Sequence, residues 1–165
     1  MATIRAQLHK VHTSALCYIP PLEQQEGIQH LRVAHDKQIH RWPPHVNLLY
    51  PFLPEEEFEA AAAHLAAMLQ GVPPFGVTFE RMRQFKHGKK RFTAWLDPTA
   101  CEEGQWQALQ ARCLEAFPHC TDQTARGAFV PHLTIGQFGD EDLFAAREQP
   151  RTTQPRMPVG TRSFT

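Results

Sequence analysis

The chain has 165 residues, of which 42% are hydrophobic and 21% charged, and these proportions are ordinary for one globular domain. Its 17 basic and 17 acidic side chains cancel, which excludes a strongly basic coat for nucleic acid and confines any polyanion contact to a local patch. No stretch approaches the ~18–20 apolar residues of a membrane-spanning helix, and the charged N-terminus has no apolar core of a signal peptide.

Apolar periodicity and proline or glycine breaks predict alternating strands and helices. The elements are, in chain order, a strand, a helix, a strand that follows a histidine, a helix, a hairpin, a helix, a second such strand and a helix. They are predicted over residues 13–19, 27–38, 46–52, 54–70, 76–96, 105–117, 131–138 and 140–147. This order predicts the α+β class, with helices packed outside antiparallel sheets.

Two of these helices have the clearest patterns. The helix over 54–70 begins with Pro54 and three glutamates, where the helix dipole favours acidic residues, and Gly71 closes it. Its predicted buried stripe is Phe58, Ala61, Ala62, Leu65, Met68 and Leu69. For the helix over 105–117 the predicted inward residues are Trp106, Leu109, Cys113, Leu114 and Phe117.

We predict one domain over residues 1–147, followed by a loosely structured tail over 148–165 that has little apolar periodicity. None of the four cysteines forms a C-x-x-C pair or another zinc spacing. This usage predicts reduced thiols in an intracellular protein, cytoplasmic or nuclear, with no metal and no cofactor. The cysteines are Cys17, Cys101, Cys113 and Cys120.

Two stretches about half the chain apart repeat the same pattern. Pro44-His45-Val46-Asn47 and Pro131-His132-Leu133-Thr134 each join Pro-His to an apolar residue and a small hydrogen-bonding residue. Successive strand residues point to opposite faces, so His45 shares a face with Asn47, and His132 with Thr134. The sequence therefore predicts two histidines and two polar partners that face one cleft.

This set of side chains suits acid–base chemistry on a phosphate. One histidine can activate the attacking oxygen and the other can protonate the leaving oxygen, because imidazole titrates near neutral pH. Asn47 and Thr134 can donate hydrogen bonds to non-bridging oxygens as charge builds there. A lone histidine on a strand is usually structural, and eight of the ten histidines are interpreted in that way; the repeated context sets this pair apart.

Other candidates for phosphate or base contacts keep a structural alternative. Tyr50, Phe85 and Phe138 could stack on bases or belong to the core. Arg41 and Arg126 each precede a motif histidine and could hold a phosphate, as could the basic turn Lys86–Arg91, which is otherwise a solvated turn. Trp42 could stack on a base or fix the loop.

The two motifs, HVNLLYPF and HLTIGQF, resemble the paired H-x-[ST/N]-apolar motifs of the two-histidine (2H) phosphoesterase superfamily, the 2′-5′ RNA ligase-like proteins. His35-Asp36-Lys37 and Arg41-Trp42-Pro43-Pro44-His45 also resemble a eukaryotic branch of that superfamily. The match covers roughly residues 10–145, with Asn47 standing where many members have threonine or serine. The resemblance implies a bilobal fold, with two pseudo-symmetric lobes and a water-filled central cleft.

The resemblance also implies a metal-independent phosphodiesterase. His45 and His132 would be its acid–base pair, hydrolysing a 2′,3′-cyclic phosphate or a 2′-5′ phosphodiester, and 3′-end trimming is a further possible reaction of the superfamily. The expected partner is an RNA end or a small nucleotide, with no DNA and no membrane, and the protein is expected to be a monomer. The alternative is a catalytically weak module that binds RNA or nucleotides in the same cleft.

Overall fold

The structure, a computed structural model, describes residues 9–139. The helix predicted over 140–147 and the tail over 148–165 lie outside the described residues. Within 9–139 the helices are α1 (Leu22–His35), α2 (Phe58–Met68), preceded by the 3-10 turn η1 (Glu55–Glu57), and α3 (Gln105–Ala116). The strands are β1 (Leu16–Tyr18), β2 (Val46–Leu49), β3 (Val77–Lys86), β4 (Phe92–Ala100) and β5 (Leu133–Phe138).

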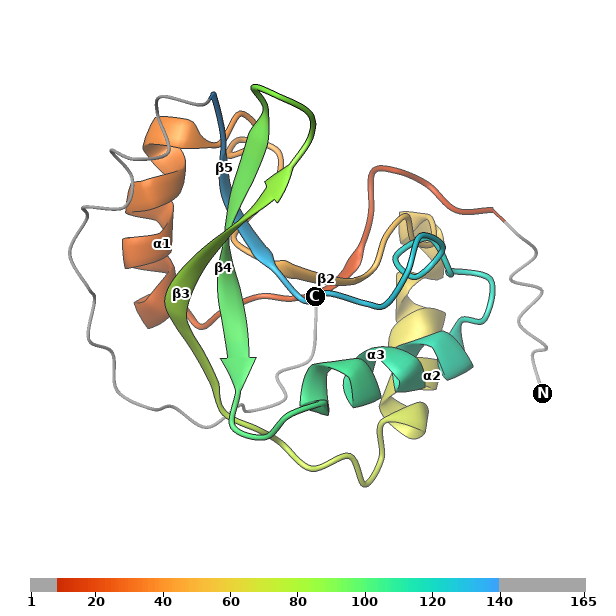
Figure 1. The fold of residues 1–165 in the computed structure, drawn as a ribbon. Helices are drawn as coiled ribbons and strands as arrows, with labels where there is room; N and C mark the ends of the chain where they lie inside the picture. Colours follow the sequence, from red (N-terminus) through yellow and green to blue (C-terminus); the bar gives the residue numbers. More distant parts are fainter. Residues whose placement is uncertain (1–8, 140–165) are drawn as a thin grey trace.

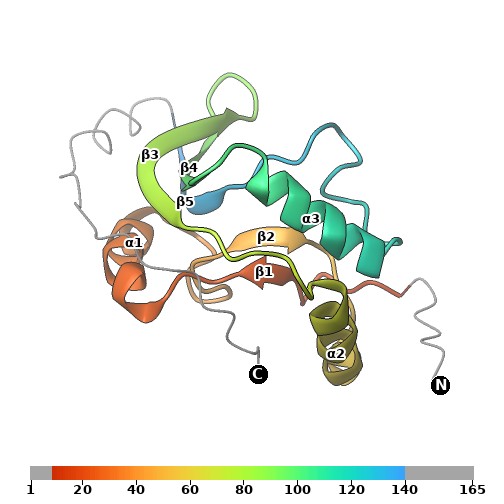
Figure 2. The same ribbon diagram turned by 90° about the horizontal axis from the view of Figure 1, so that it is seen from below.

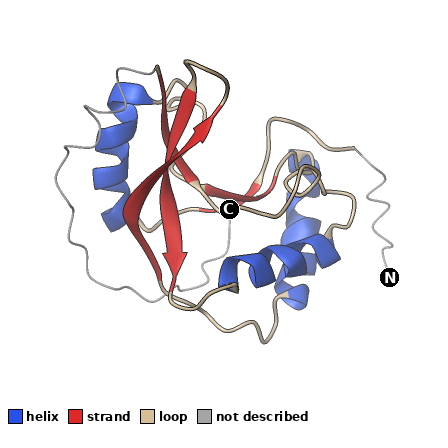
Figure 3. Cartoon of the chain, in the orientation of Figure 1, coloured by secondary structure: helices blue, strands red, loops and turns tan. Residues whose placement is uncertain are grey.

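The strands form two antiparallel sheets, which confirms the predicted α+β class (Figure 3). One sheet pairs β1 with β2, and the other has the order β3-β4-β5. The isolated bridge between Val11 and Phe52 continues the pairing next to the small sheet. Two pseudo-symmetric lobes around a cleft stay a prediction from the resemblance.

Each sheet packs against a helix from the other half of the chain. α1 lies between β1 and β2 in sequence, yet it packs on β5 of the larger sheet. α3, from the second half, packs on β2 and on α2. Figures 1 and 2 show this separation, with α1 beside the β3-β4-β5 sheet and α2 and α3 on the other side of the molecule. The two halves therefore share one core.

At the start of each histidine-bearing strand, buried and half-buried positions alternate. Val46 and Leu48 on β2 are buried, as are Leu133 and Ile135 on β5. The positions between them, including Asn47, are only half-buried, as the repeated motif predicts. Burial of these apolar residues thus turns Asn47 and Thr134 away from them, whereas further along the strands Leu49 and Phe138 are buried as well.

The first helix begins and ends earlier than predicted. α1 starts at Leu22 because Pro21 fixes the preceding turn, and the Pro21 carbonyl accepts the amide of Gln24 at 2.9 Å. It ends at His35, where Asp36 adopts an extended conformation. The apolar residues at helical spacing that predict this helix include Val33 and Ala34, yet both are exposed, Val33 by 73%. The short apolar pattern located the helix, but it gave the wrong limits and two residues that do not face the core.

The stripe predicted for α2 is only partly buried. Ala61 is in the core, whereas Phe58 is 41% exposed and Ala62 is also exposed. The 3-10 turn η1 occupies the acidic segment that was expected to form the first helical turn, so α2 proper begins at Phe58. In α3 the predicted residues Trp106, Cys113 and Phe117 are all buried.

The predicted hairpin is present, and β4 runs four residues beyond its expected end. Pro98 lies inside β4 although proline cannot donate to a strand ladder. The register of β3 and β4 shifts between Thr78 and Arg81, and this irregularity lies opposite the segment that contains Pro98. Gly88 in the turn has a φ of 103°, a conformation that favours glycine.

None of the helices described here is long and apolar enough to cross a membrane. All four cysteines have free thiols in the structure, and Cys101 is exposed rather than buried. Burial raises the pKa of the Cys113 thiol to about 12 and those of Cys17 and Cys120 to about 11. These three thiols are therefore held in their protonated form.

Candidate active site

The two motif histidines occupy equivalent positions immediately before a strand. His45 precedes β2 of the small sheet, and His132 precedes β5 of the larger sheet. A proline comes before each one, and this favours an extended backbone as the chain enters the strand. Both imidazoles are half-buried. The same local sequence therefore gives the backbone the same extended conformation before both histidines.

Each imidazole is fixed by a hydrogen bond of the same kind. Nδ1 of His45 donates to the carbonyl of Pro43 at 2.7 Å, and Nδ1 of His132 donates to the carbonyl of Val130 at 2.8 Å. A carbonyl can only accept, so Nδ1 carries the proton in both neutral rings. Nε2 is then left with a lone pair on each ring. Both Nε2 atoms can accept a proton, or donate one when the ring is charged.

Burial lowers the pKa of both imidazoles below the ordinary histidine value, and the Nδ1 hydrogen bonds partly oppose this effect. For His45, the charge of Arg32 and that of protonated His132 lower the pKa further, whereas the Asp36 carboxylate raises it. A proton on one imidazole therefore disfavours a proton on the other.

The two polar partners lie on the strands as the motif predicts. Asn47 on β2 and Thr134 on β5 are both half-buried, and their strand positions pair with Cys17 and Trp95 respectively. The Oδ1 atom of Asn47 is buried and has no hydrogen-bond partner among residues 9–139. A buried polar atom without a partner is uncommon in proteins. The Asn47 side chain therefore has an acceptor without a partner, while donation to a phosphate oxygen would come from its NH₂ group.

Trp42 lies beside His45 and is itself in contact with two other predicted residues, Arg41 and Tyr50. The Trp42 ring lies 5.6 Å from the His45 ring and 6.0 Å from the Tyr50 ring. The Tyr50 hydroxyl donates to the carbonyl of His12 at 3.1 Å, and the Arg41 guanidinium donates to the same carbonyl at 2.7 Å. Arg41 also lies 5.3 Å from the centre of the Trp42 ring. Trp42 thus packs beside His45, and Arg41 and Tyr50 tie this corner to the N-terminal segment.

Aromatic rings also surround His132. The Phe85 ring lies 5.0 Å from the His132 ring and stacks on Trp95 at 4.8 Å. The Trp95 ring is itself 5.9 Å from His132. Trp95 is buried, and its Nε1 has no hydrogen-bond partner within the described part of the chain. The structure therefore brings the predicted Phe85 to the site and adds Trp95, which the sequence pattern did not single out.

Phe138 lies in the core, and Arg126 makes no contact that links it to either motif histidine within residues 9–139. Phe138 is 5% exposed and packs against His35 of α1, with ring centres 4.6 Å apart, so its ring occupies the core. Arg126 is exposed in the turn that leads toward His132. Burial of Phe138 agrees with the core alternative that its position on the strand left open.

A buried ion pair supports the segment that leads to His45. Arg32 is 1% exposed, and its guanidinium donates to the Asp36 carboxylate at 2.8 Å, to Gln29 at 2.8 Å and to the Trp42 carbonyl at 2.7 Å. All of these partners are local in sequence, and the last holds the backbone three residues before His45. The i, i+4 spacing of Arg32 and Asp36 was visible in the sequence, but their burial was not.

The same carboxylate connects this segment to β5. Asp36 Oδ1 accepts the backbone amide of Gln38 at 2.9 Å and the Gln137 amide at 3.4 Å, and Gln137 Oε1 accepts the backbone amide of Lys37 at 3.0 Å. The lead-in to His45 is therefore hydrogen-bonded to β5, the strand that follows His132. Within residues 9–139, no three His, Cys, Asp or Glu side chains are grouped so that they could hold a metal ion.

The fold and the site define an α+β protein in which strands of two different sheets each present a histidine with a free Nε2. The family model of the 2′-5′ RNA ligase superfamily matches residues 20–161, and the chain belongs to this superfamily. The resemblance of the two motifs is thereby confirmed.

A Geobacillus kaustophilus protein named as a putative phosphoesterase is 25% identical over 119 residues. The aligned part covers 72% of this chain and 65% of that relative, so the chain spans less than two thirds of the relative's length. No solved structure matches the chain.

Proposed function

We propose that the protein is a metal-independent phosphoesterase that opens a 2′,3′-cyclic phosphate or cleaves a 2′-5′ phosphodiester, at an RNA end or in a small nucleotide. One observation carries the proposal. The Nδ1 atoms of His45 and His132 are both anchored to a carbonyl two residues earlier, which leaves two Nε2 atoms for proton transfer. Membership of the 2′-5′ RNA ligase superfamily supports the phosphate chemistry.

For a cyclic phosphate, we assign His132 as the general base and His45 as the general acid. Nε2 of His132 takes a proton from water, whose oxygen attacks phosphorus. Protonated His45 gives its Nε2 proton to the 3′ oxygen as the P–O3′ bond breaks. The products are a 2′-phosphate and a free 3′ hydroxyl, and the roles of the histidines reverse in the opposite direction. Asn47 and Thr134 would donate hydrogen bonds to the non-bridging oxygens.

The direct test measures turnover of 2′,3′-cyclic nucleotides and of 2′-5′ oligoadenylate in the presence of EDTA. We expect turnover to persist in EDTA, and His45→Ala and His132→Ala each to reduce it by about 10²–10⁴-fold, the usual contribution of one proton transfer. His40→Ala is the matched control, because His40 is exposed in the same segment that leads to His45. Wild-type turnover in either motif variant would contradict the proposal.

A substrate with sulfur in place of the leaving 3′ oxygen tests the assignment of roles. A thiolate leaves without prior protonation, so this substrate should largely restore turnover by His45→Ala and leave His132→Ala impaired. The opposite pattern would exchange the two roles. Tight RNA binding with no product from any substrate would instead favour the alternative, a binding module that uses the same residues.

A further inference from the structure

The turn between β3 and β4 carries a dense group of positive charge in a protein whose net charge is zero. From Arg81 to Leu96 the sequence has six lysines or arginines and no acidic residue. We use the name basic tip for the part of this group at the turn, all of which is exposed: Lys86, His87, Lys89, Lys90 and Arg91.

Contacts at the base of the turn hold the basic tip in place and leave its charge available. His87 Nε2 lies 2.9 Å from the Thr93 hydroxyl across the hairpin, and the Lys86 ammonium lies 5.8 Å from the Phe92 ring centre. The His87 amide donates to the Arg91 carbonyl at 2.7 Å. Among the ion pairs within residues 9–139, none involves a lysine or arginine of the basic tip.

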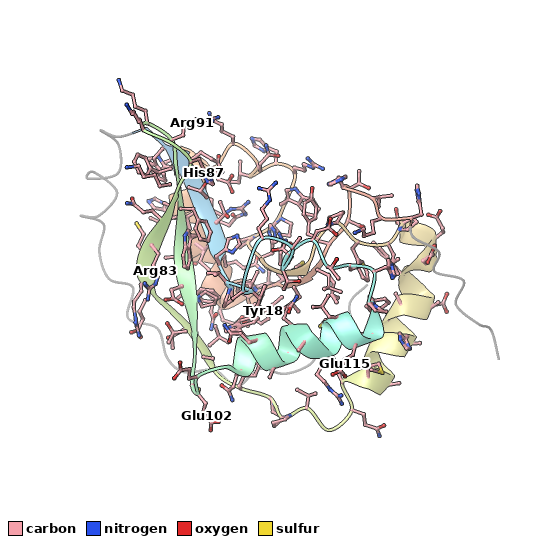
Figure 4. The ribbon with its side chains drawn as sticks, turned by 45° about the vertical axis from the view of Figure 1, so that its right-hand side comes forward. Tyr18, Arg83, His87, Arg91, Glu102 and Glu115 are labelled. Atoms are coloured by element: carbon pink, nitrogen blue, oxygen red, sulfur yellow. The ribbon has the colours of Figure 1, made fainter. Side chains whose placement is uncertain are left out.

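Charge changes sign along the hairpin. Figure 4 shows His87 and Arg91 at one end, Arg83 further along and Glu102 at the opposite end. Arg83 is paired with Asp97 at 2.6 Å, so the middle of the hairpin is close to neutral, and Glu102 and Glu103 follow β4 at the far end. A polyanion that contacts this hairpin is therefore attracted to the turn and repelled from the other end.

An aromatic contact connects the positive end of the hairpin with the candidate active site, although the backbone of His132 lies level with the middle of the hairpin, where Leu133 pairs with Leu96. Phe85, whose ring lies 5.0 Å from that of His132, directly precedes the basic tip on β3. Strand alternation puts Phe85 and His87 on the same face. A chain whose terminal phosphate reaches His132 can thus continue along this face toward the turn.

We propose that the substrate is an RNA strand rather than a single nucleotide, and that the basic tip binds phosphates beyond the reacting one. This inference rests on the proposed function and specifies its substrate class. Lys89, Lys90 and Arg91 hold the backbone, and the half-buried Phe85 ring offers a face to a base near the reacting end. An electrically neutral protein needs such a local patch to retain a polyanion.

Binding measurements can test this path separately from catalysis. The probes are ribo-oligonucleotides with a 3′-phosphate, which carry no bond for the proposed reaction, in di-, tetra- and decanucleotide lengths. We expect affinity to rise from the dinucleotide to the tetranucleotide and then to level off. The triple variant Lys89→Gln/Lys90→Gln/Arg91→Gln should weaken decanucleotide binding at least tenfold. Its slope of log affinity against log salt should fall by about 2, at ~0.7 per phosphate contact on a single strand.

Two controls make the result specific. Dinucleotide binding should be unchanged in the triple variant, and Arg112→Gln, which removes an exposed charge from α3, should leave decanucleotide binding unchanged. Equal affinity and salt dependence for all lengths would overturn the inference, as would an equal loss for the dinucleotide and the decanucleotide. In both cases the assays with 2′,3′-cyclic nucleotides would still decide the proposed function independently.

Discussion

The hydrogen bonds of His45 and His132 determine which nitrogen of each ring can react. In both cases a carbonyl two residues earlier accepts from Nδ1, and a proline directly precedes the histidine. The repeated Pro-His pair is thus associated with the Nδ1-protonated tautomer of the histidine and with an extended backbone where the strand begins. The sequence predicted the two histidines from the repeat, but it did not predict which nitrogen would be free.

The pH dependence of turnover should reflect the lowered pKa values of this pair. Catalysis needs one histidine protonated and the other neutral, and burial places both pKa values of the free protein below the ordinary value of about 6.5. We therefore expect a bell-shaped profile of kcat/KM with its maximum below about pH 6.5 and a fall toward alkaline pH. Initial rates at low substrate concentration across the pH range provide the measurement.

Bound substrate should shift the profile in a known direction. A phosphate anion near both imidazoles favours their charged forms, so the alkaline limb of kcat should lie at higher pH than that of kcat/KM. A maximum of kcat/KM above about pH 7.5 would contradict the role of burial at these two histidines.

Removal of Asp36 should destabilise the protein strongly. Asp36→Ala leaves the guanidinium of Arg32, which is 1% exposed, without its anionic partner, and loss of one member of a buried pair typically costs about 3–5 kcal/mol. Urea denaturation measures the effect. Glu115→Ala is the control, because it breaks an exposed pair with Arg112 and should cost less than about 1 kcal/mol. Equal losses in the two variants would contradict the importance of burial.

Trp95 and Arg32 were not singled out from the sequence, because their positions depend on tertiary contacts. Trp95 lies far from His132 in sequence, and only the pairing of β4 with β5 places it beside Thr134. Arg32 has an ordinary position on a helix, and its burial depends on where α1 packs. A single sequence indicates strand faces through alternation, but it does not indicate which strands and helices become neighbours.

At the scale of elements, the end of α1 packs closely on β5. A Cβ atom at Gly136 would lie 2.5 Å from the Cβ of His35 and 2.8 Å from its backbone carbonyl. Only glycine allows the end of the helix to approach the strand so closely. This contact lies beside the Asp36–Gln137 hydrogen bond. Two separate contacts with β5 therefore fix the position of the helix end.

Gly136→Ala should therefore destabilise the fold by about 1–3 kcal/mol, since the clash involves backbone that cannot move aside. His35→Ala should give no relief, because alanine keeps the Cβ atom. Gly76→Ala is the comparison: its Cβ would meet the Sγ of Cys101 at 2.7 Å, so Cys101→Ala should relieve that clash. Denaturant titrations of the four variants test this contrast, and rescue of Gly136→Ala by His35→Ala would refute it.

The types of the elements were easier to predict than their limits. Alternation and helical periodicity identified every described strand and helix, apart from the short turn η1, which was expected to be helical. β4 extends through Pro98 because the irregular register opposite it removes the need for a proline amide. That compensation depends on the partner strand, and no pattern within β4 itself reveals it.

At the scale of the molecule, the residues of the candidate site come from two separate sheets. β2 of the small sheet leads from His45, and β5 of the larger sheet leads from His132. A phosphate that contacts both histidines would therefore connect the sheets, and binding would stabilise both at once.

Hydrogen exchange measures this coupling. With adenosine 2′-phosphate as the ligand, we expect slower amide exchange in both β2 and β5, and loss of both effects in His132→Ala. Protection limited to one sheet would show that the ligand contacts only one of the histidines.

The packing of each sheet against a helix from the other half has a consequence for how the chain can be divided. A cut in the linker between α2 and β3 would give two fragments, one with α1 but without β5, and the other with α3 but without β2. Neither fragment retains a complete apolar layer, so each should stay unfolded alone, whereas the mixed fragments can assemble through complementation. Both histidines are thus held in place only when the two halves of the chain fold together. Neither half alone should present its histidine in the conformation described here.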